Sequence, residues 1–246
     1  MDNAELYETI FKRKSIRKYK SELLDLSTLK EVRLFTSTLT PMIPGIKTNI
    51  RILGGDEVKG MFKSKAPHYL AIYSEQKEGF AANAGFLFQQ ADLYFSARGI
   101  GSCWHMLSKP LQKNDPSSGL KFVIGLAFGQ PAEDLQRKSV SEFKRKPLSE
   151  ITDIKELDEL LEPARLAPSG VNNQSWYFRG DSKSIDAFYA KSGITRLMNQ
   201  INVGIALCHI WLAALHAGRS VDFVVIGERE NGAPKGYRYV ISLQMK

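Results

Sequence analysis

Two long apolar helices, one in each half of the chain, constrain the fold more than any other feature of the sequence. Segment 79–98 repeats apolar residues at helical spacing. Its buried stripe is formed by Ala84, Phe88, Ala91 and Phe95. Segment 199–217 is apolar on most of its faces, so we expect it to be buried all round. The same order of basic run, helix, strand, long helix and strand occurs twice. This predicts an α+β protein built by duplication and fusion of two half-units, 1–146 and 147–246.

Capping residues, prolines and apolar runs place the shorter elements. In the first half we expect a helix over 5–11, a helix over 28–39 with Ser27 as its N-cap, and strands over 48–53, 68–73 and 121–129. In the second half we expect a helix that starts at Thr152 and Asp153 and contains Pro163, then strands over 175–179, 222–227 and 236–243.

The loop that follows this last helix, within ARLAPSGVNNQSW at 164–176, has the composition of a ligand-binding turn. Pro168 ends the helix, and Ser169 and Gly170 leave room for a flat molecule to approach the backbone. The amides of Asn172, Asn173 and Gln174 offer donors and acceptors to a planar ring. An ordinary amide-rich turn without a ligand is the alternative, because the same residues are common in turns.

A basic run lies near the start of the chain and contains Lys12, Arg13, Lys14, Arg17, Lys18 and Lys20, with Ser15 inside it. Fixed positive charge beside a hydroxyl group is what a phosphate group requires. Each charge-assisted hydrogen bond contributes about 1.5–3 kcal/mol, so two or three would hold a phosphate firmly. A solvated basic segment and a nucleic-acid patch are the alternatives.

Together, the basic run and the loop resemble the FMN-dependent nitroreductase family. That family opens with R-R-S-x-R-x-[FY] and later carries A-x-x-A-P-S-x-x-N-x-Q-P-W. The first motif is matched by Arg13, Lys14, Ser15, Arg17 and Tyr19, with Lys for one Arg. The second is matched by Ala164, Ala167, Pro168, Ser169, Asn172, Gln174 and Trp176. Ser175 stands where the family usually has proline, and most of a domain separates two motifs that normally lie much closer together.

Two further segments are similar to the same family. GIGSCWHM at 99–106 resembles the G-L-G-T-C-W segment after the long central helix, and the resemblance places Trp104, His105 and Met106 beside the reactive edge of the flavin. The turn at 129–133 resembles G-x-P-A-E, after which a basic group helps to hold the FMN phosphate. The resemblance assigns that contact to Lys144 and Arg145.

In the family, FMN lies across a homodimer interface, and here the matching parts occur once each in one chain. The resemblance implies that Arg13, Lys14, Ser15 and Arg17 hold the phosphate and ribityl groups. It implies that Pro168, Ser169, Gly170 and Asn172 line the ring from the other half. Loop 36–47 lacks the S-x-x-N-x-Q pattern and contains Pro41 and Pro44. We therefore expect a nitroreductase-like antiparallel or mixed sheet flanked by helices, forming a pseudo-dimer with one intact FMN site and one degenerate site.

The resemblance implies an FMN-dependent NAD(P)H oxidoreductase that reduces a small-molecule acceptor such as a nitroaromatic or a quinone. Flavin carries the redox step, so no catalytic side chain and no metal are expected. His105 is expected to be structural or to line the substrate. A different flavin reaction, a flavin-binding protein without catalysis and a basic nucleic-acid-binding protein are the alternatives.

Composition bears on the partners of the protein and on its cellular compartment. The net charge of +8 favours anionic partners such as nucleotide phosphates. Cys103 and Cys208 form no disulfide framework and no metal-ligand spacing, so a reducing cytoplasm is expected. We find no secretory signal and no segment approaching the roughly 18 apolar residues that span a bilayer. The chain is thus expected to be a monomer that acts as an internal pseudo-dimer, without nucleic-acid or membrane partners.

Overall fold

The computed structural model describes residues 2–60 and 65–246 and contains two four-stranded antiparallel sheets. The first sheet has the order β1 (Thr48–Gly54), β3 (His68–Ser74), β6 (Lys121–Gly129) and β4 (Gly101–His105). The second has the order β7 (Trp176–Gly180), β8 (Ser184–Ala190), β10 (Tyr237–Met245) and β9 (Val221–Val224). A short ribbon pairs β2 (Val58–Lys59) with β5 (Lys109–Pro110).

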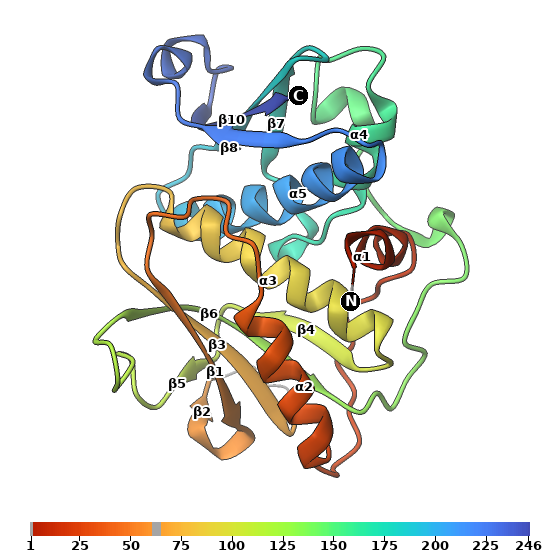
Figure 1. Ribbon diagram of the computed structural model, residues 1–246, viewed down its shortest axis with the longest axis vertical. Coiled ribbons are helices and arrows are strands. Elements are labelled where there is room, and N and C mark those ends of the chain that lie inside the picture. Colours follow the sequence, from red (N-terminus) through yellow and green to blue (C-terminus); the bar gives the residue numbers. More distant parts are fainter. Residues whose placement is uncertain (1, 61–64) are drawn as a thin grey trace.

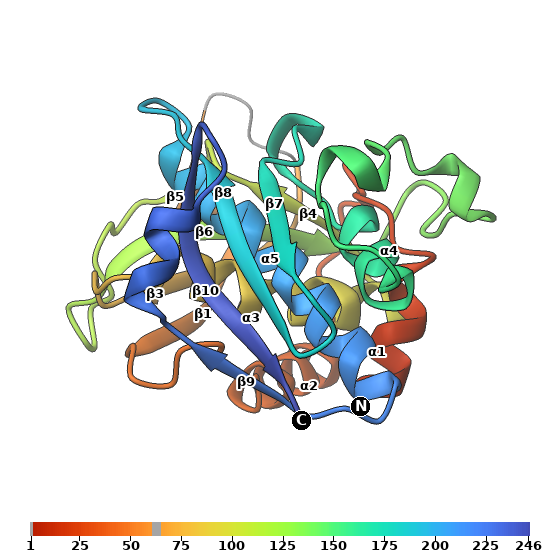
Figure 2. The same ribbon diagram turned by 90° about the horizontal axis from the view of Figure 1, so that it is seen from above.

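Two long helices form the layer between the sheets, as the two views in Figures 1 and 2 show. These are α3 (Phe80–Ala97) and α5 (Arg196–His216). The other helices are α1 (Asn3–Ile10), which packs on α3 and α5, α2 (Leu26–Ser37), which packs on β1, and α4 (Asp158–Leu166), which packs on α5.

Two glycines allow the central helices to cross closely. A Cβ at Gly85 would overlap the carbonyl oxygen of Ile201, and a Cβ at Gly204 would overlap that of Ala82. The two contacts are equivalent, because Gly85 and Gly204 have the same sequence separation as Ala82 and Ile201. The helices are therefore related by an approximate two-fold axis that passes through their crossing.

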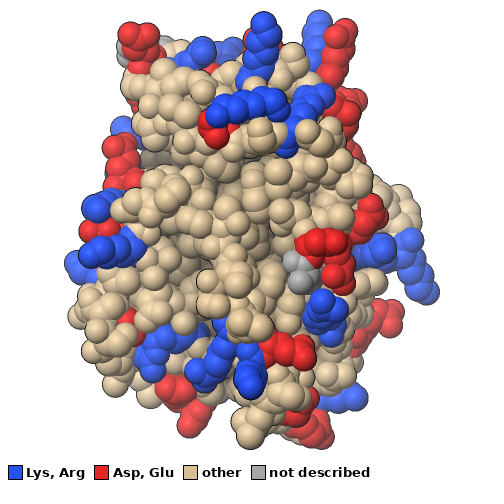
Figure 3. Space-filling view, viewed as in Figure 1, with Lys and Arg blue, Asp and Glu red and all other residues tan. Residues whose placement is uncertain are grey.

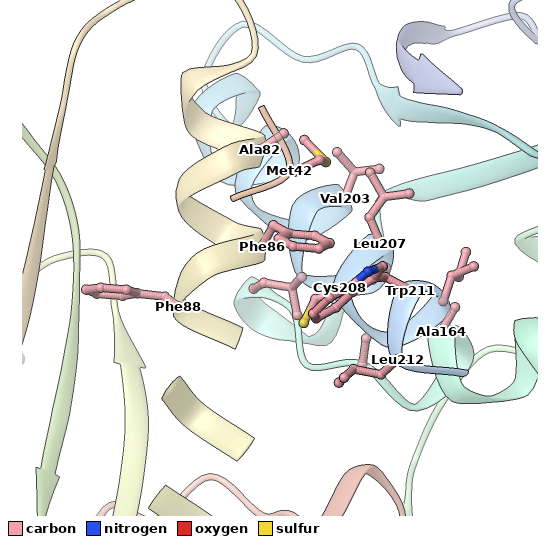
Figure 4. Packing of buried hydrophobic residues seen from close by; sticks show 14 of the residues in the cluster. Met42, Ala82, Phe86, Phe88, Ala164, Val203, Leu207, Cys208, Trp211 and Leu212 are labelled. Atoms are coloured by element: carbon pink, nitrogen blue, oxygen red, sulfur yellow. The ribbon is translucent and has the colours of Figure 1, made fainter. Parts of the chain in front are cut away.

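Large apolar side chains fill the space around this crossing. Figure 4 shows Phe86 of α3 directed at α5, beside Leu207 and Trp211, whereas Phe88 points away toward the first sheet. The rings of Phe86 and Trp211 lie 5.3 Å apart. One continuous core thus joins both halves of the chain.

The topology of the two halves is the same. Each half runs helix, two strands, long helix, two strands, and each sheet has the order first, second, fourth, third strand. The expected α+β fold with two fused parts is confirmed, and the pairing between the strands of both sheets is antiparallel.

Three details of the sequence-based element assignment are wrong. The N-cap of α2 is Asp25 rather than Ser27, because the Asp25 carboxylate accepts the Thr28 N–H at 2.8 Å. Helix α4 begins at Asp158, because the segment from Thr152 pairs with the second sheet instead, through a bridge to Phe178. Strand β8 was not predicted at all, and β9 ends at Val224.

The expectation that no segment is long and apolar enough to span a bilayer is also wrong. Helix α5 has 21 residues and is long and apolar enough to cross a membrane by length and composition alone. However, 83% of its most apolar 18-residue stretch is buried inside the protein, so this helix has the burial of a core element. On the face drawn in Figure 3, Lys and Arg side chains stand beside Asp and Glu around the periphery, and the centre is largely uncharged.

Candidate functional site

A cavity of about 130 Å³ lies where the two halves meet. Three segments that are far apart in the sequence line it: the basic run, strand β4 with the residues after it, and the loop after α4. A face of α5 forms its floor. The lining residues are Ser15, Arg17, Cys103, Trp104, Met106, Ile124, Pro168, Ser169, Gly170, Val171, Met198, Ile201, Asn202 and Ile205.

Two residues of the basic run reach the cavity and one supports them from behind. Arg13 is only 1% exposed and forms an ion pair with Asp92 of α3, with Nε and Oδ2 2.9 Å apart. A second nitrogen of Arg13 donates to Ser15 Oγ at 3.0 Å. Arg13 therefore positions Ser15 rather than lining the cavity. Arg17 lies at the surface, and no carboxylate among the described residues pairs with its guanidinium group.

Lys14 points away from the cavity. Its ammonium group donates to the Asp134 carbonyl at 3.1 Å and lies 3.8 Å from the Glu133 carboxylate. The same carboxylate accepts the Arg17 backbone N–H at 2.8 Å. The turn at 130–134 thus anchors the basic run to the first sheet.

Strand β4 presents an open edge to the cavity. It pairs with β6 on one side, and on the other its Ser102 carbonyl accepts the Ile16 N–H at 2.8 Å. Because strand residues alternate with a period of two, the backbone polar groups of Trp104 lie on the same open edge. The Trp104 indole N–H is buried and has no acceptor among the described residues. Backbone and indole donors are therefore both available at this wall.

His105 does not line the cavity. Its ring packs against Tyr69 at 5.9 Å, and its Nδ1 lies 3.3 Å from Ser108 Oγ. Burial, with a smaller effect from Arg17, lowers the pKa of His105, so the ring is neutral near pH 7. Burial likewise raises the pKa of the Cys103 thiol, which is therefore a poor nucleophile.

The loop after α4 has a strained backbone. It contains a short 3₁₀ turn, Gly170–Asn172, and three of its non-glycine residues have left-handed φ angles: Val171 at 50°, Asn172 at 56° and Gln174 at 43°. Each such residue costs about 1–2 kcal/mol. Strain of this kind persists where the surroundings enforce it and is common at binding sites.

The polar side chains of this loop are used to hold the loop itself. The Asn172 amide accepts from Arg145 Nη1 at 2.7 Å and donates to the Lys144 carbonyl at 2.8 Å. Gln174 is 1% exposed and donates to the Arg165 carbonyl at 3.1 Å. These amides do not line the cavity, so the expected contact of Asn172 with a ring ligand stays a prediction. What the loop offers the cavity is the small surface of 168–170.

Arg145 also supports the loop instead of projecting into the cavity. Its guanidinium group donates to the carbonyls of Leu166 and Ala167 at 3.1–3.3 Å, at the end of α4. Burial, followed by the nearby charges of Arg13 and Arg137, lowers the pKa of Arg145 to about 10. Arg137 and Arg145 both lie over the Phe143 ring, and the third nearby guanidinium group, that of Arg13, is paired with Asp92.

One wall of the cavity was missed by sequence reasoning. It comes from α5, whose lining positions recur at intervals of three and four residues, as one helix face requires. Helical spacing alone could have predicted this face, but the helix is apolar all round and gives no sign of which side is lined. The missed residues on α5 are Met198, Ile201, Asn202 and Ile205, and the missed residues elsewhere are Cys103, Ile124 and Val171.

Loop 40–47 occupies the equivalent position in the other half. The Ile43 N–H donates to a side chain of α3 at 2.9 Å, just as the Gly170 N–H donates to a side chain of α5 at 3.0 Å. At the candidate site, Gly170 of the loop lies against Met198 of the helix. In the other half the large and small residues are exchanged, since Ile43 of the loop lies against Gly79 at the start of the helix. The larger side chain of this contact therefore comes from the loop in that half and from the helix at the candidate site.

Residues 5–214 match a family model described as "Putative TM nitroreductase". The chain belongs to this nitroreductase family. Among solved structures, it is similar to a protein from Thermotoga maritima described as a putative nitroreductase, at 19% identity over 100% of this chain and 93% of that one, with a TM-score of 0.63. An FMN-dependent nitroreductase from Clostridium difficile R20291 shows 16% identity over 59% of this chain and 100% of that one, with a TM-score of 0.43. No curated protein sequence matches the chain.

Family membership confirms the resemblance found in the sequence. The structure divides the residues that the resemblance named into two groups. Those on the cavity are Ser15, Arg17, Trp104, Met106, Pro168, Ser169 and Gly170. Those off the cavity are Arg13, Lys14, His105, Lys144, Arg145 and Asn172. Most of these hold the segments that carry the cavity residues, through hydrogen bonds and ion pairs.

Proposed function

We propose that this nitroreductase-family protein is an FMN-dependent NAD(P)H oxidoreductase with one FMN site per chain, built from both halves of an internal pseudo-dimer. The observation that carries the proposal is the cavity that joins the basic run, β4 and the loop after α4. These are the segments that the family motifs assign to the cofactor, and they come from opposite halves of the chain.

The residues present fit a flavin. The cavity is lined by Trp104, by the hydroxyl group of Ser15 and by Arg17. Within the part of the chain that the structure describes, the buried Trp104 indole N–H has no acceptor and the Arg17 guanidinium group has no carboxylate partner. The loop contributes a surface without bulk at Gly170, where a Cβ would overlap the Met198 sulfur. A planar ring needs a flat wall with a few donors, and a phosphate tail needs fixed positive charge.

Each part of the site has a separate task. Arg17 and Ser15 would hold the phosphate and ribityl groups, and Arg137 and Arg145 add positive charge nearby. Met106 and Ile205 exclude water from the wall on which the ring would lie. When bound, FMN supplies the redox chemistry by accepting a hydride from NADH or NADPH and passing electrons to an acceptor. No side chain has to transfer a proton, and the half-buried, neutral His105 lies off the cavity.

The small-molecule acceptor is proposed to be a nitroaromatic, a quinone or a similar planar compound, and the protein to act as a cytoplasmic monomer. The apolar walls at Ile124, Ile201 and Ile205 favour an apolar, planar acceptor over a highly charged one.

The test is the visible absorbance of the purified protein and its FMN content, before and after added FMN and anaerobic NADPH or NADH. We expect about one FMN per chain and bleaching of the flavin band on addition of the reductant. The double variant Ser15→Asp with Arg17→Glu should lose FMN and remain folded. Arg17→Glu alone has a matched control in Lys18→Glu, which makes the same change of charge at an exposed neighbouring position that does not line the cavity. A wild-type protein that takes up no FMN would refute the proposal.

A further inference from the structure

Two buried asparagines occupy equivalent positions on the central helices but make different numbers of hydrogen bonds. On α3, Asn83 Oδ1 accepts the Ile43 N–H at 2.9 Å, and its Nδ2 group has no acceptor among the described residues. On α5, Asn202 Oδ1 accepts the Gly170 N–H at 3.0 Å. Its Nδ2 group also donates to Asn173 Oδ1 at 3.0 Å and to Ser175 Oγ at 3.1 Å. Asn83 and Asn202 are 0% and 2% exposed.

The equivalence does not depend on the asparagines alone. Asn83 and Asn202 have the same sequence separation as Gly85 and Gly204, which form the helix crossing. The loop turns also match, since the Ile46 N–H donates to the Ile43 carbonyl and the Asn173 N–H to the Gly170 carbonyl, both at 3.2 Å. The two asparagines are therefore the same structural position in the two halves.

The loops that they hold differ in strain. In the loop of the candidate site, Val171, Asn172 and Gln174 all have left-handed backbones. Within the described residues, loop 40–47 has no non-glycine residue of this kind. The helix asparagine therefore makes three bonds where the loop is strained and one where it is not. The three hydrogen-bond partners of Asn202 belong to Gly170, Asn173 and Ser175, which lie on both sides of the strained residues.

We propose that Asn202 is the positioning residue of the FMN site, holding the strained loop so that the backbone of 168–170 stays against the cavity. The inference rests on the proposed function, because it takes FMN as the ligand. A left-handed backbone at a β-branched residue such as Val171 relaxes unless its surroundings fix it. Without Asn202, the Asn173 side chain keeps one contact on α5, at 3.3 Å from Asn199 Oδ1, and Gly170 keeps none there through its N–H. The bonds of Asn172 and Gln174 would remain, but the backbone at 168–170 would lose its hydrogen bond to α5 and shift in the cavity.

The test compares Asn202→Leu with Asn83→Leu. Both variants put an apolar side chain of similar size at a buried asparagine position of a central helix, so Asn83→Leu controls for the general effect on the core. The dissociation constant of FMN is measured by quenching of flavin fluorescence, and the visible circular dichroism of the bound flavin reports its environment. We expect Asn202→Leu to weaken FMN binding by about tenfold or more and to change the dichroism, because several hydrogen bonds are lost. We expect Asn83→Leu to bind FMN within about twofold of wild type.

A second measurement does not require FMN. Hydrogen exchange of the protein without added flavin should increase at 170–175 in Asn202→Leu and at 43–46 in Asn83→Leu. If Asn202→Leu does not fold, Ser175→Ala removes one of the three bonds and should show the same effects on a smaller scale. Equal FMN affinities in the two asparagine variants, or unchanged exchange at 170–175, would overturn the positioning role. Wild-type protein without affinity for FMN would instead overturn the proposed function, and the exchange experiment would still decide whether Asn202 fixes the loop.

Discussion

His209 should make the protein unstable in mild acid, because its surroundings accept only the neutral ring. The residue is 0% exposed on α5. Its Nδ1 lies 2.7 Å from the Pro163 carbonyl, so Nδ1 must carry the proton. Its Nε2 lies 3.0 Å from the amide nitrogen of Gln89, which donates, so Nε2 is unprotonated in this arrangement. A proton added at Nε2 would face this donor inside the core, and the Gln89 amide would have to rotate to accept it.

The size of the effect follows from the pKa. Burial is the main cause that lowers the pKa of His209, to about 3, and the positive charges of Arg13 and Arg145 add to it. In the unfolded chain a histidine has a pKa of about 6.5. The unfolded state therefore binds a proton that the folded state does not, and stability is lost as the pH falls from 6.5 toward 3. The loss amounts to about 2 kcal/mol at pH 5 and about 3 kcal/mol at pH 4.

The assay is urea unfolding of wild type and His209→Gln, followed by tryptophan fluorescence at several pH values from about 7.5 to about 4. Near neutral pH the variant should be less stable by about 1–3 kcal/mol, because the Pro163 carbonyl and Gln89 lose a partner. The stability difference should then shrink by about 2 kcal/mol by pH 5, since the variant has no buried group to protonate. His216→Gln changes an exposed histidine on the same helix and serves as the control. Curves for wild type and His209→Gln that run parallel over this range would refute the reasoning.

Three other outcomes are expected. Purified protein should bind one FMN rather than two, measured by absorbance against protein concentration, because loop 36–47 lacks the S-x-x-N-x-Q pattern of the candidate site; two would contradict the single-site proposal. Asp92→Asn should lower the free energy of unfolding in urea by about 3–5 kcal/mol by leaving the Arg13 charge buried and unpaired; an unchanged midpoint would contradict this. Gly204→Ala should lower the melting temperature through a loss of about 1–3 kcal/mol, whereas Gly193→Ala, which meets open space, should not.

The sequence predicted those parts of the fold in which local pattern and burial agree. Helix α3 was found because its apolar residues follow the helical period, and strand β6 because it is a short continuous apolar run. Strand β8 was missed because Asp186 interrupts its apolar run. That carboxylate is buried and accepts from Ser242 Oγ at 2.6 Å, a partner on β10 that no local pattern reveals. A buried polar pair between distant segments looks, in the sequence, like an exposed position.

The same limit applies to the candidate site. The motifs correctly brought the basic run, β4 and the loop to one place, because each motif is a local segment with its own shape. They did not indicate which side chains face the cavity. Asn172 turns toward Arg145 and Lys144, which come from a segment before α4, and Arg13 turns toward Asp92 on α3. Such directions depend on contacts between segments, so a motif residue can serve a site from behind it.

The repeated topology of the two halves allows residues at one of the two symmetry-related positions to change without altering the other position. The cavity uses an edge strand from the first half and a loop from the second. Its symmetry-related position uses the other pair, loop 40–47 and strand β9, so the two positions share only the crossing of α3 and α5. Bulk at Ile43 therefore leaves the first cavity unchanged, whereas a change at Gly85 or Gly204 would disturb both. On this reasoning, the helix crossing is the part of the duplication that both halves must keep alike, and the loops are the part that could become different.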